Sequence, residues 1–285
     1  MRVILLPVAD RPECVQALDY GFQLAKQVGA NVYGCHVRPH KYSDIAIPAG
    51  EMVVLVPEAA EWELLSKNKS SKKSLTQAAA MFESCAGKQD YSVLKKPRAT
   101  PGAYWSERTG SPDKVLSIMG PLSDLVIVSR PEKNGRVAQL FLNAALFQSA
   151  RPVLVLPQSK QKTVAKRISI AWNQSAEAAK AVTAALPLLQ HAEHVQIITQ
   201  GPEVGLGPKA KQLVTYLAHW GVKAQVAKGT GKDDAKAILQ AYKKANSDLL
   251  IMGAYSHSRL RQRLFGGVTD FMLQKANIPL FAYHN

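Results

Sequence analysis

The sequence has few cysteines, no long apolar run and a shortage of acidic side chains. Its three cysteines, Cys14, Cys35 and Cys85, are widely spaced and form no C-x-x-C motif, which disfavours a disulfide framework. No apolar run approaches the roughly 18 residues that a membrane span needs. These absences predict reduced thiols, a cytoplasmic location and no membrane partner.

The shortage of acids gives the chain a large positive charge. Its 36 lysines and arginines outnumber 21 aspartates and glutamates, for a net charge of +15. Residues 1–160 carry a net +6 and residues 161–285 a net +9, so the excess is spread over both halves, unlike a basic tail. This balance favours anionic partners such as nucleotides, nucleic acids or anionic lipid surfaces, without choosing among them. A length of 285 residues that are 47% hydrophobic is enough for two domains.

The second half alternates apolar segments of strand length with amphipathic segments of helix length. Ser175 is placed to cap the first of the expected helices, and the last of them is expected near residues 268–275. The expected strands are 167–172, 195–199, 222–228, 248–252 and 278–282. Strands alternating with helices predict right-handed crossovers and a doubly wound parallel sheet, which is an α/β, Rossmann-like fold.

The first half repeats this order. Residues 123–128 mirror 247–252, and residues 2–4 mirror 167–169. A helix is expected from Ser111 or Pro112 to Met119. The expected strands are 3–8, 31–37, 91–94, 124–128 and 152–156. The chain is therefore predicted to be a tandem duplication.

The predicted domain boundaries follow from this repeat. A first domain covers residues 1–157, a polar and basic linker covers 158–166, and a second domain covers 167–285. The first domain is longer because of an insertion at about residues 38–74. This insertion carries the lysines Lys67, Lys69, Lys72 and Lys73.

The segment between the fourth strand and the last helix of the second half is the strongest candidate for chemistry. Open α/β sheets bind their ligands at the carboxyl ends of their strands, where this segment begins. Gly253 allows a sharp turn off the strand, and Gly266 and Gly267 allow close approach of an anion just before a helix. Thr269 adds a hydroxyl donor. The pattern favours a phosphate-binding loop.

This segment resembles the G-x2-G-x9-G-[ST] nucleotide loop of universal stress proteins, and the chain is similar to their tandem two-domain form. The resemblance implies an adenine-nucleotide-hydrolase-like fold and a stress-response regulator that binds ATP with Mg and is not an enzyme. It assigns nucleotide binding to the second domain, at positions Asn173, Thr199, Met252, Gly253, Ser256, Gly266, Gly267, Val268 and Thr269.

Three of these positions depart from the family pattern. Ser256 replaces the second glycine of the motif, Gly267 replaces the usual Ser or Thr, and Asn173 stands where Asp is usual. These departures predict weak nucleotide binding. In the first domain, bulky residues at 140–143 stand where the glycine pair is expected, which predicts a nucleotide-free domain.

Other functions stay open at this level. A nucleotide-free interaction scaffold of the same fold is the main alternative, and a slow ATP-cleaving enzyme or a non-specific nucleic-acid binder is less favoured. His257 has no nucleophile or acidic partner nearby in sequence, and Pro39 disfavours a metal site at His36 and His40. The two halves are expected to pair through residues 153–156 and 279–282. A homodimer and an unknown protein partner stay open.

Overall fold

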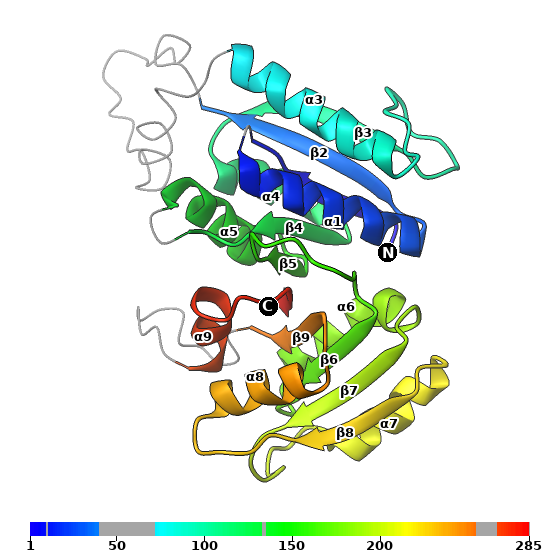
Figure 1. The fold of residues 1–285 in the computed structure, drawn as a ribbon, viewed down its shortest axis with the longest axis vertical. Coiled ribbons are helices and arrows are strands. Elements are labelled where there is room, and N and C mark those ends of the chain that lie inside the picture. The colour runs from blue at the N-terminus through cyan, green and yellow to red at the C-terminus, as the bar shows by residue number, and fades with distance from the viewer. Residues whose placement is uncertain (10, 40–71, 133–134, 255–266, 285) are drawn as a thin grey trace. The chain divides into compact units, whose positions relative to one another are not determined.

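A computed structural model of the 285-residue chain describes residues 1–9, 11–39, 72–132, 135–254 and 267–284. The chain divides into two compact units, Arg2–Arg151 and Pro152–Asn285. Strands and helices alternate in both of them (Figure 1). Within the described ranges, no helix has the length and apolar character needed to cross a membrane.

The first unit contains a parallel sheet in the order β3-β2-β1-β4. Its strands are β1 (Val3–Pro7), β2 (Asn31–Arg38), β3 (Ala103–Thr109) and β4 (Leu125–Ser129). Its helices are α1 (Pro12–Val28), α3 (Lys72–Lys88), α4 (Pro112–Met119) and α5 (Arg136–Gln148), and a short 3-10 turn covers Gly120–Leu122. The predicted helix ending at Met119 is therefore confirmed.

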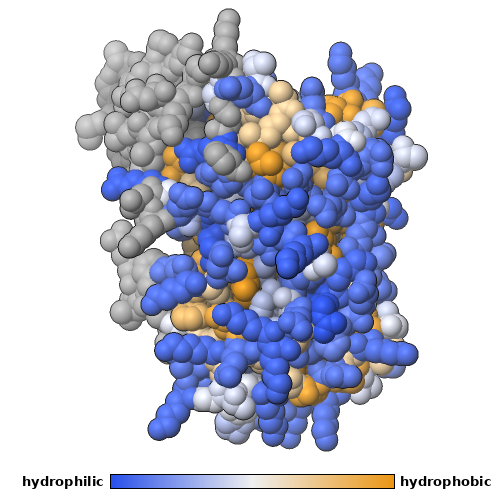
Figure 2. Space-filling view, in the orientation of Figure 1, coloured by the Kyte–Doolittle hydropathy of each residue, from blue (hydrophilic) through white to orange (hydrophobic). Residues whose placement is uncertain are grey.

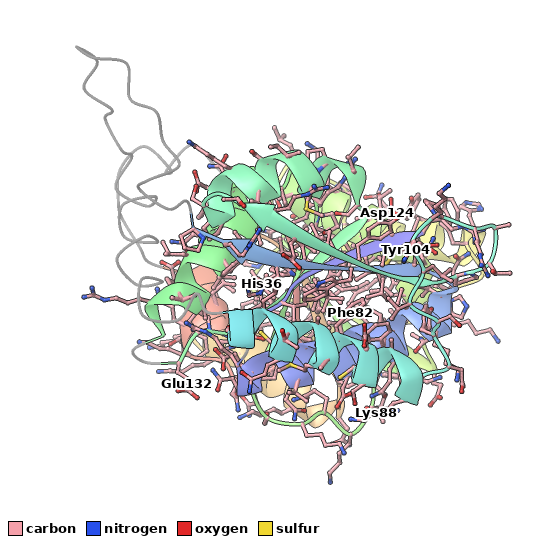
Figure 3. The ribbon with its side chains drawn as sticks, turned by 90° about the horizontal axis from the view of Figure 1, so that it is seen from above. His36, Phe82, Lys88, Tyr104, Asp124 and Glu132 are labelled. Carbon is pink, nitrogen blue, oxygen red and sulfur yellow. The ribbon has the colours of Figure 1, made fainter. Side chains whose placement is uncertain are left out.

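An aromatic cluster fills the space between α3 and the sheet. Phe82 of α3 packs over Gly34 of β2, where a Cβ atom would lie 2.6 Å from the phenyl ring. The Phe82 ring also lies 5.3 Å from the rings of Phe22 and Trp105. Figure 3 shows Phe82 inside this layer and His36 toward the carboxyl edge of the sheet. The glycine in β2 is thus explained by close packing of an aromatic ring.

The predicted third strand at residues 91–94 is wrong. The strand that pairs with β2 is β3, and Val93 makes only an isolated bridge to Ala103. The Tyr91 hydroxyl instead donates to the carbonyl of Ala30, 2.8 Å away, and its ring packs against Phe22. Because β3 is an edge strand whose second half is polar and exposed, its sequence lacks the apolar run of the central strands.

The second unit contains a sheet in the order β5-β10-β9-β6-β7-β8, in which only the β5–β10 pair is antiparallel. Its strands are β5 (Val153–Leu156), β6 (Arg167–Ala171), β7 (His194–Thr199), β8 (Ala224–Lys228), β9 (Leu249–Gly253) and β10 (Leu280–Tyr283). Its helices are α6 (Ala176–Leu189), α7 (Ala210–His219), α8 (Asp234–Lys244) and α9 (Val268–Gln274). The fold is α/β and Rossmann-like, as predicted.

The cap of α6 and the pairing of the closing strands were both expected from the sequence. The Ser175 hydroxyl accepts a hydrogen bond from the amide of Ala178 at 3.1 Å, which confirms Ser175 as the cap of α6. The expected pairing of the closing strands is observed between β5 and β10, although both strands belong to the second unit. The domain boundary at residue 157 stays a prediction.

The mirrored sequence segments occupy equivalent places in the two units. A carboxylate oxygen of Asp124 accepts hydrogen bonds from the amides of Val3, at 2.9 Å, and of the residue before it. The carboxylate of Asp248 does the same for Arg167, at 2.9 Å, and for the residue before it. In each unit, an aspartate at the start of one central strand therefore fixes the start of its neighbour. This likeness supports the proposed duplication.

Candidate functional site

Several expected ligand positions converge at the carboxyl edge of the second sheet. The parallel register places Ala171 of β6 beside Met252 of β9 and Ile198 of β7. Two further expected positions, Thr199 and Gly253, follow this row directly, and a third, Asn173, lies two residues after Ala171. Because these parallel strands end at the same edge, the structure brings the three together.

Gly253 is required by packing against α6. A Cβ atom at this position would lie 2.5 Å from the backbone nitrogen of Ala178 and 2.7 Å from the Cβ of Glu177. Real Cβ atoms do not come so close to backbone, so the first turn of α6 would have to move. The glycine therefore allows α6 to begin directly over the end of β9, whether or not a ligand binds beside it.

The start of α9 has a backbone conformation that favours glycine. Gly267 is exposed and has φ +123° and ψ −168°. Val268 and Thr269 form the first turn of the helix together with Asp270. A carboxylate in the first helical turn interacts favourably with the helix dipole, as a phosphate would, so Asp270 occupies the position that favours an anion. Ser256 and Gly266, two further expected ligands, lie outside the described residues.

Asn173 and Thr199 both make hydrogen bonds within the protein, Asn173 through its side chain and Thr199 through its backbone. Asn173 is exposed, and its side-chain oxygen accepts a hydrogen bond from the amide of Ser175 at 3.2 Å, in the turn that leads into α6. Thr199 is buried, and its carbonyl oxygen accepts from the amide of Gly229 at 2.8 Å. Both residues therefore help to build the edge of the sheet.

Hydrogen bonds of the Gln174 side chain join the loop after β6 to the loop after β7, and no sequence pattern predicted them. We call this set of hydrogen bonds the Gln174 bracket. Gln174 has φ +63°, and its side-chain nitrogen donates to the carbonyl oxygens of Gly207, at 2.7 Å, and Gly205, at 3.2 Å. The amide of Gly205 in turn donates to the side-chain oxygen of Gln174 at 3.0 Å. Trp172 is buried, and its indole nitrogen donates to the carbonyl of Pro208 at 2.8 Å. The only signal in the sequence is the high glycine content of residues 201–207.

The loop held by this bracket also caps the next helix. The carboxylate of Glu203 accepts a hydrogen bond from the amide of Ala210, the first residue of α7, at 2.6 Å. The amide of Lys209 donates to the side-chain oxygen of Gln212 at 2.8 Å. Residues 201–209 therefore make hydrogen bonds both to α7 and to the β6–α6 loop, and these bonds fix the position of the segment next to Gln174.

The described residues offer little for metal or nucleophilic chemistry. Among them, no three His, Cys, Asp or Glu residues gather closely enough to hold a metal ion. Cys14, Cys35 and Cys85 are all buried, as thiols rather than disulfides. Burial raises the pKa of Cys35 to about 11 and that of Cys85 to about 12, so both remain protonated at neutral pH.

The corresponding edge of the first unit is built differently. Ser129 ends β4, and its hydroxyl donates to the carbonyl of Glu13 in α1 at 2.9 Å. The next residue, Arg130, is buried, and this burial lowers the pKa of its guanidinium to about 10. Leu140 and Leu142 are buried in α5, in the segment where the glycine pair was expected.

Comparisons with known proteins agree on the family. Residues 168–284 match the model of the universal stress protein family. Universal stress protein Slr1230 of Synechocystis is 30% identical over 175 residues, which are 56% of this chain and 58% of that protein. The chain thus spans less than two thirds of the length of this relative.

Two solved structures share the fold. A universal stress protein from Archaeoglobus fulgidus superposes with a TM-score of 0.68 at 16% identity, over 99% of this chain and 98% of that one. A functionally unknown protein from Pseudomonas aeruginosa superposes with a TM-score of 0.53 at 11% identity, over 100% and 92% of the two chains. The comparisons thus show that residues 168–284 match the universal stress protein family and that the chain shares the fold of these two structures.

Proposed function

We propose that the chain is a stress-response regulator whose second unit binds an adenine nucleotide weakly, as ATP with Mg. The observation that carries this proposal is the convergence of Asn173, Thr199 and Gly253 at one edge of the sheet. The match of residues 168–284 to the universal stress protein family supports a non-enzymatic role. A cytoplasmic location stays a prediction from the sequence.

The described residues suit a nucleotide in part. Among the described residues, none lies within 4 Å of the place where a side chain at Gly267 would begin, and we infer that a phosphate would be able to approach the backbone before α9. Thr269 would supply a hydroxyl, and Asn173 and Met252 would lie near the ribose or base. Asp270 repels phosphate, and Asn173 already accepts a backbone hydrogen bond. We therefore expect a low affinity.

Calorimetric titration with Mg–ATP tests this proposal with a matched pair of variants. Gly267→Asp adds a side chain and a negative charge at φ +123°, at a position where no described residue lies within 4 Å. Gly231→Asp adds the same group at φ +120°, also with no described residue within 4 Å, but beyond the edge strand β8. Saturable heat that is lost in Gly267→Asp and kept in Gly231→Asp supports the proposal.

A nucleotide-free interaction scaffold is the second candidate. Two observations favour it, namely the packing requirement for Gly253 and the position of Asp270 in the first turn of α9. Under this alternative, millimolar Mg–ATP would produce neither heat nor a shift in the melting temperature. That result would overturn the nucleotide proposal and direct attention to protein partners.

The duplication and the association of the halves are also proposals. The shared strand order β3-β2-β1-β4 and β8-β7-β6-β9 and the equivalent roles of Asp124 and Asp248 support a tandem repeat. The β5–β10 ladder supports pairing of the closing strands within one chain. Sedimentation velocity of the full chain would show whether two chains also associate as a homodimer.

A further inference from the structure

The exposed large apolar side chains of the second unit are concentrated in one short part of the chain. In the described part of that unit, they all fall between residues 204 and 226, although the unit is 134 residues long. They are Val204, Leu206, Tyr216, Trp220 and Val226. Together with the lysines between residues 201 and 232, we call them the α7 surface. They lie in the loop after β7, in and directly after α7, and on β8.

The two most exposed of these side chains stand on a loop that is held in place. Val204 is 84% exposed and Leu206 is fully exposed. The glycines on either side of Leu206 are the ones whose backbone groups bond to Gln174. A leucine at the tip of a loop fixed by several hydrogen bonds is presented to solvent by the fold itself.

The aromatic members of the surface continue along α7. Tyr216 of α7 and Trp220, the residue that directly follows the helix, are 38% and 45% exposed and have ring centroids 6.4 Å apart. Leu213 and Leu217, which lie three residues before Tyr216 and Trp220, are buried. The two rings thus lie at the margin of the buried side of α7 and are partly exposed there.

Val226 extends the surface onto the edge strand β8, where it is 43% exposed. It is in register with Ile197, one residue beyond Gln196 on β7. Gln196 donates to the carbonyl of Ala241 in α8, so Val226 faces away from α8.

The same segment is strongly basic. Between residues 201 and 232 the only acidic residue is Glu203, whose carboxylate caps α7. All five lysines of the segment are exposed, which leaves a net charge of +4. They are Lys209, Lys211, Lys223, Lys228 and Lys232. Figure 2 shows hydrophilic and hydrophobic side chains mixed at the surface of the chain.

We propose that the α7 surface docks the second unit onto an anionic lipid membrane. Exposed aliphatic side chains gain free energy when they enter the boundary between headgroups and acyl chains. Trp and Tyr favour that boundary, and lysines are attracted to anionic headgroups. A single-stranded nucleic acid would use the lysines and the rings but would leave Val204 and Leu206 in water. The proposal departs from the sequence-based expectation of no membrane partner, which considered spanning segments.

Co-sedimentation of the full chain with phosphatidylglycerol vesicles tests this proposal. Leu206→Ser removes the most exposed apolar side chain and is expected to lower the vesicle partition coefficient by about tenfold. The matched control is Leu122→Ser in the first unit, where the leucine is 78% exposed, and it is expected to change nothing. Because both side chains are in solvent, neither variant is expected to alter the melting temperature. Equal loss in both variants, or no binding by the native chain, would overturn the proposal.

The lysines and Trp220 allow two independent checks. Replacing Lys209 and Lys211 by Gln is expected to weaken vesicle binding several-fold, whereas the same change at Lys95 and Lys96 is not. A blue shift of tryptophan emission on vesicle addition is expected to disappear in Trp220→Phe. Equal binding to phosphatidylcholine vesicles, or a preference for a single-stranded oligonucleotide over vesicles, would contradict a lipid partner.

Discussion

The two units have the same arrangement at the amino edge of their sheets and different residues at the carboxyl edge. At the amino edge, Asp124 holds the start of β1 and Asp248 holds the start of β6 through hydrogen bonds to backbone amides. At the carboxyl edge, β4 ends in Ser129 and β9 ends in Gly253, each six residues after a mirrored serine. The amino edge therefore serves the architecture common to both units, and the carboxyl edge distinguishes one unit from the other.

The Ser129–Gly253 pair shows how one position decides the local packing. Ser129 makes a hydrogen bond to the carbonyl of Glu13, near the start of α1. At Gly253 a Cβ atom would overlap Glu177, near the start of α6. Helix α6 therefore lies closer to the end of β9 than α1 lies to the end of β4. The last residue of β9, Gly253, therefore has no side chain, whereas the corresponding residue of the first unit, Ser129, has a hydroxyl and is followed by the buried Arg130.

The largest expected effect comes from exchanging these two residues. Gly253→Ser is expected to reduce the free energy of unfolding by about 3 kcal/mol, because the new side chain overlaps the backbone of α6. Ser129→Gly in the first unit is expected to cost only about 1 kcal/mol, through a lost hydrogen bond and added backbone freedom. Urea denaturation of both variants measures the difference. Similar costs would show that α1 and α6 approach their sheets alike.

The aspartate contacts are expected to differ less. Asp248→Ala leaves two partly buried amides without an acceptor and is expected to cost about 2 kcal/mol. Asp124→Ala is expected to cost about 1 kcal/mol, because its amide partners are exposed to water. Denaturant unfolding of the two variants provides the comparison, and a larger loss for Asp124→Ala would reverse it. An Asn substitution, which keeps one acceptor, is expected to restore part of each loss.

The hydrogen bonds of Gln174 belong to the second unit, and their removal is expected to affect that unit alone. Gln174→Ala is expected to cost about 1 kcal/mol of global stability, because the bonds lie near solvent. The amide of Gly205 is expected to exchange its hydrogen at least about tenfold faster, since it loses its acceptor. Amides in α1 serve as the internal control. Unchanged exchange at Gly205 would mean that the loop is held without Gln174.

The rate of thiol reaction also distinguishes the two units, because all three cysteines lie in the first unit. Its measurement needs no substitution and so leaves the stability of the chain unchanged. Because burial raises the pKa values of Cys35 and Cys85, the thiolate form is scarce at pH 8. We expect the folded chain to react with a disulfide reagent at least about a hundredfold more slowly than the chain in guanidinium. Rapid reaction of one thiol in the folded chain would show that its part of the first unit opens readily.

Local patterns in the sequence predicted much of the fold. The Ser175 cap, the helix after Ser111 and the buried central strands each carry a signal within a few neighbouring residues. The edge strand β3 was missed because its polar side chains face solvent. Helix α3 was not predicted, although Phe82 packs over a glycine of β2. That contact joins residues almost 50 positions apart, so it leaves no local pattern.

The candidate site was predictable in position but not in detail. The glycines and the strand order placed Gly253 and Gly267 at the carboxyl edge. The bonds of Gln174 to a loop some 30 residues away depend on side-chain geometry that no spacing rule contains. For the same reason, the packing role of Gly253 against α6 was not foreseen.

The most direct test of the central claim is hydrogen exchange of the full chain with and without millimolar Mg–ATP. The account predicts slower exchange in peptides that cover residues 171–178 and 267–272 of the second unit. It predicts no change in peptides that cover residues 128–142 of the first unit. Protection that appears in the first unit, or in neither unit, would contradict a nucleotide site at the carboxyl edge of β6, β7 and β9.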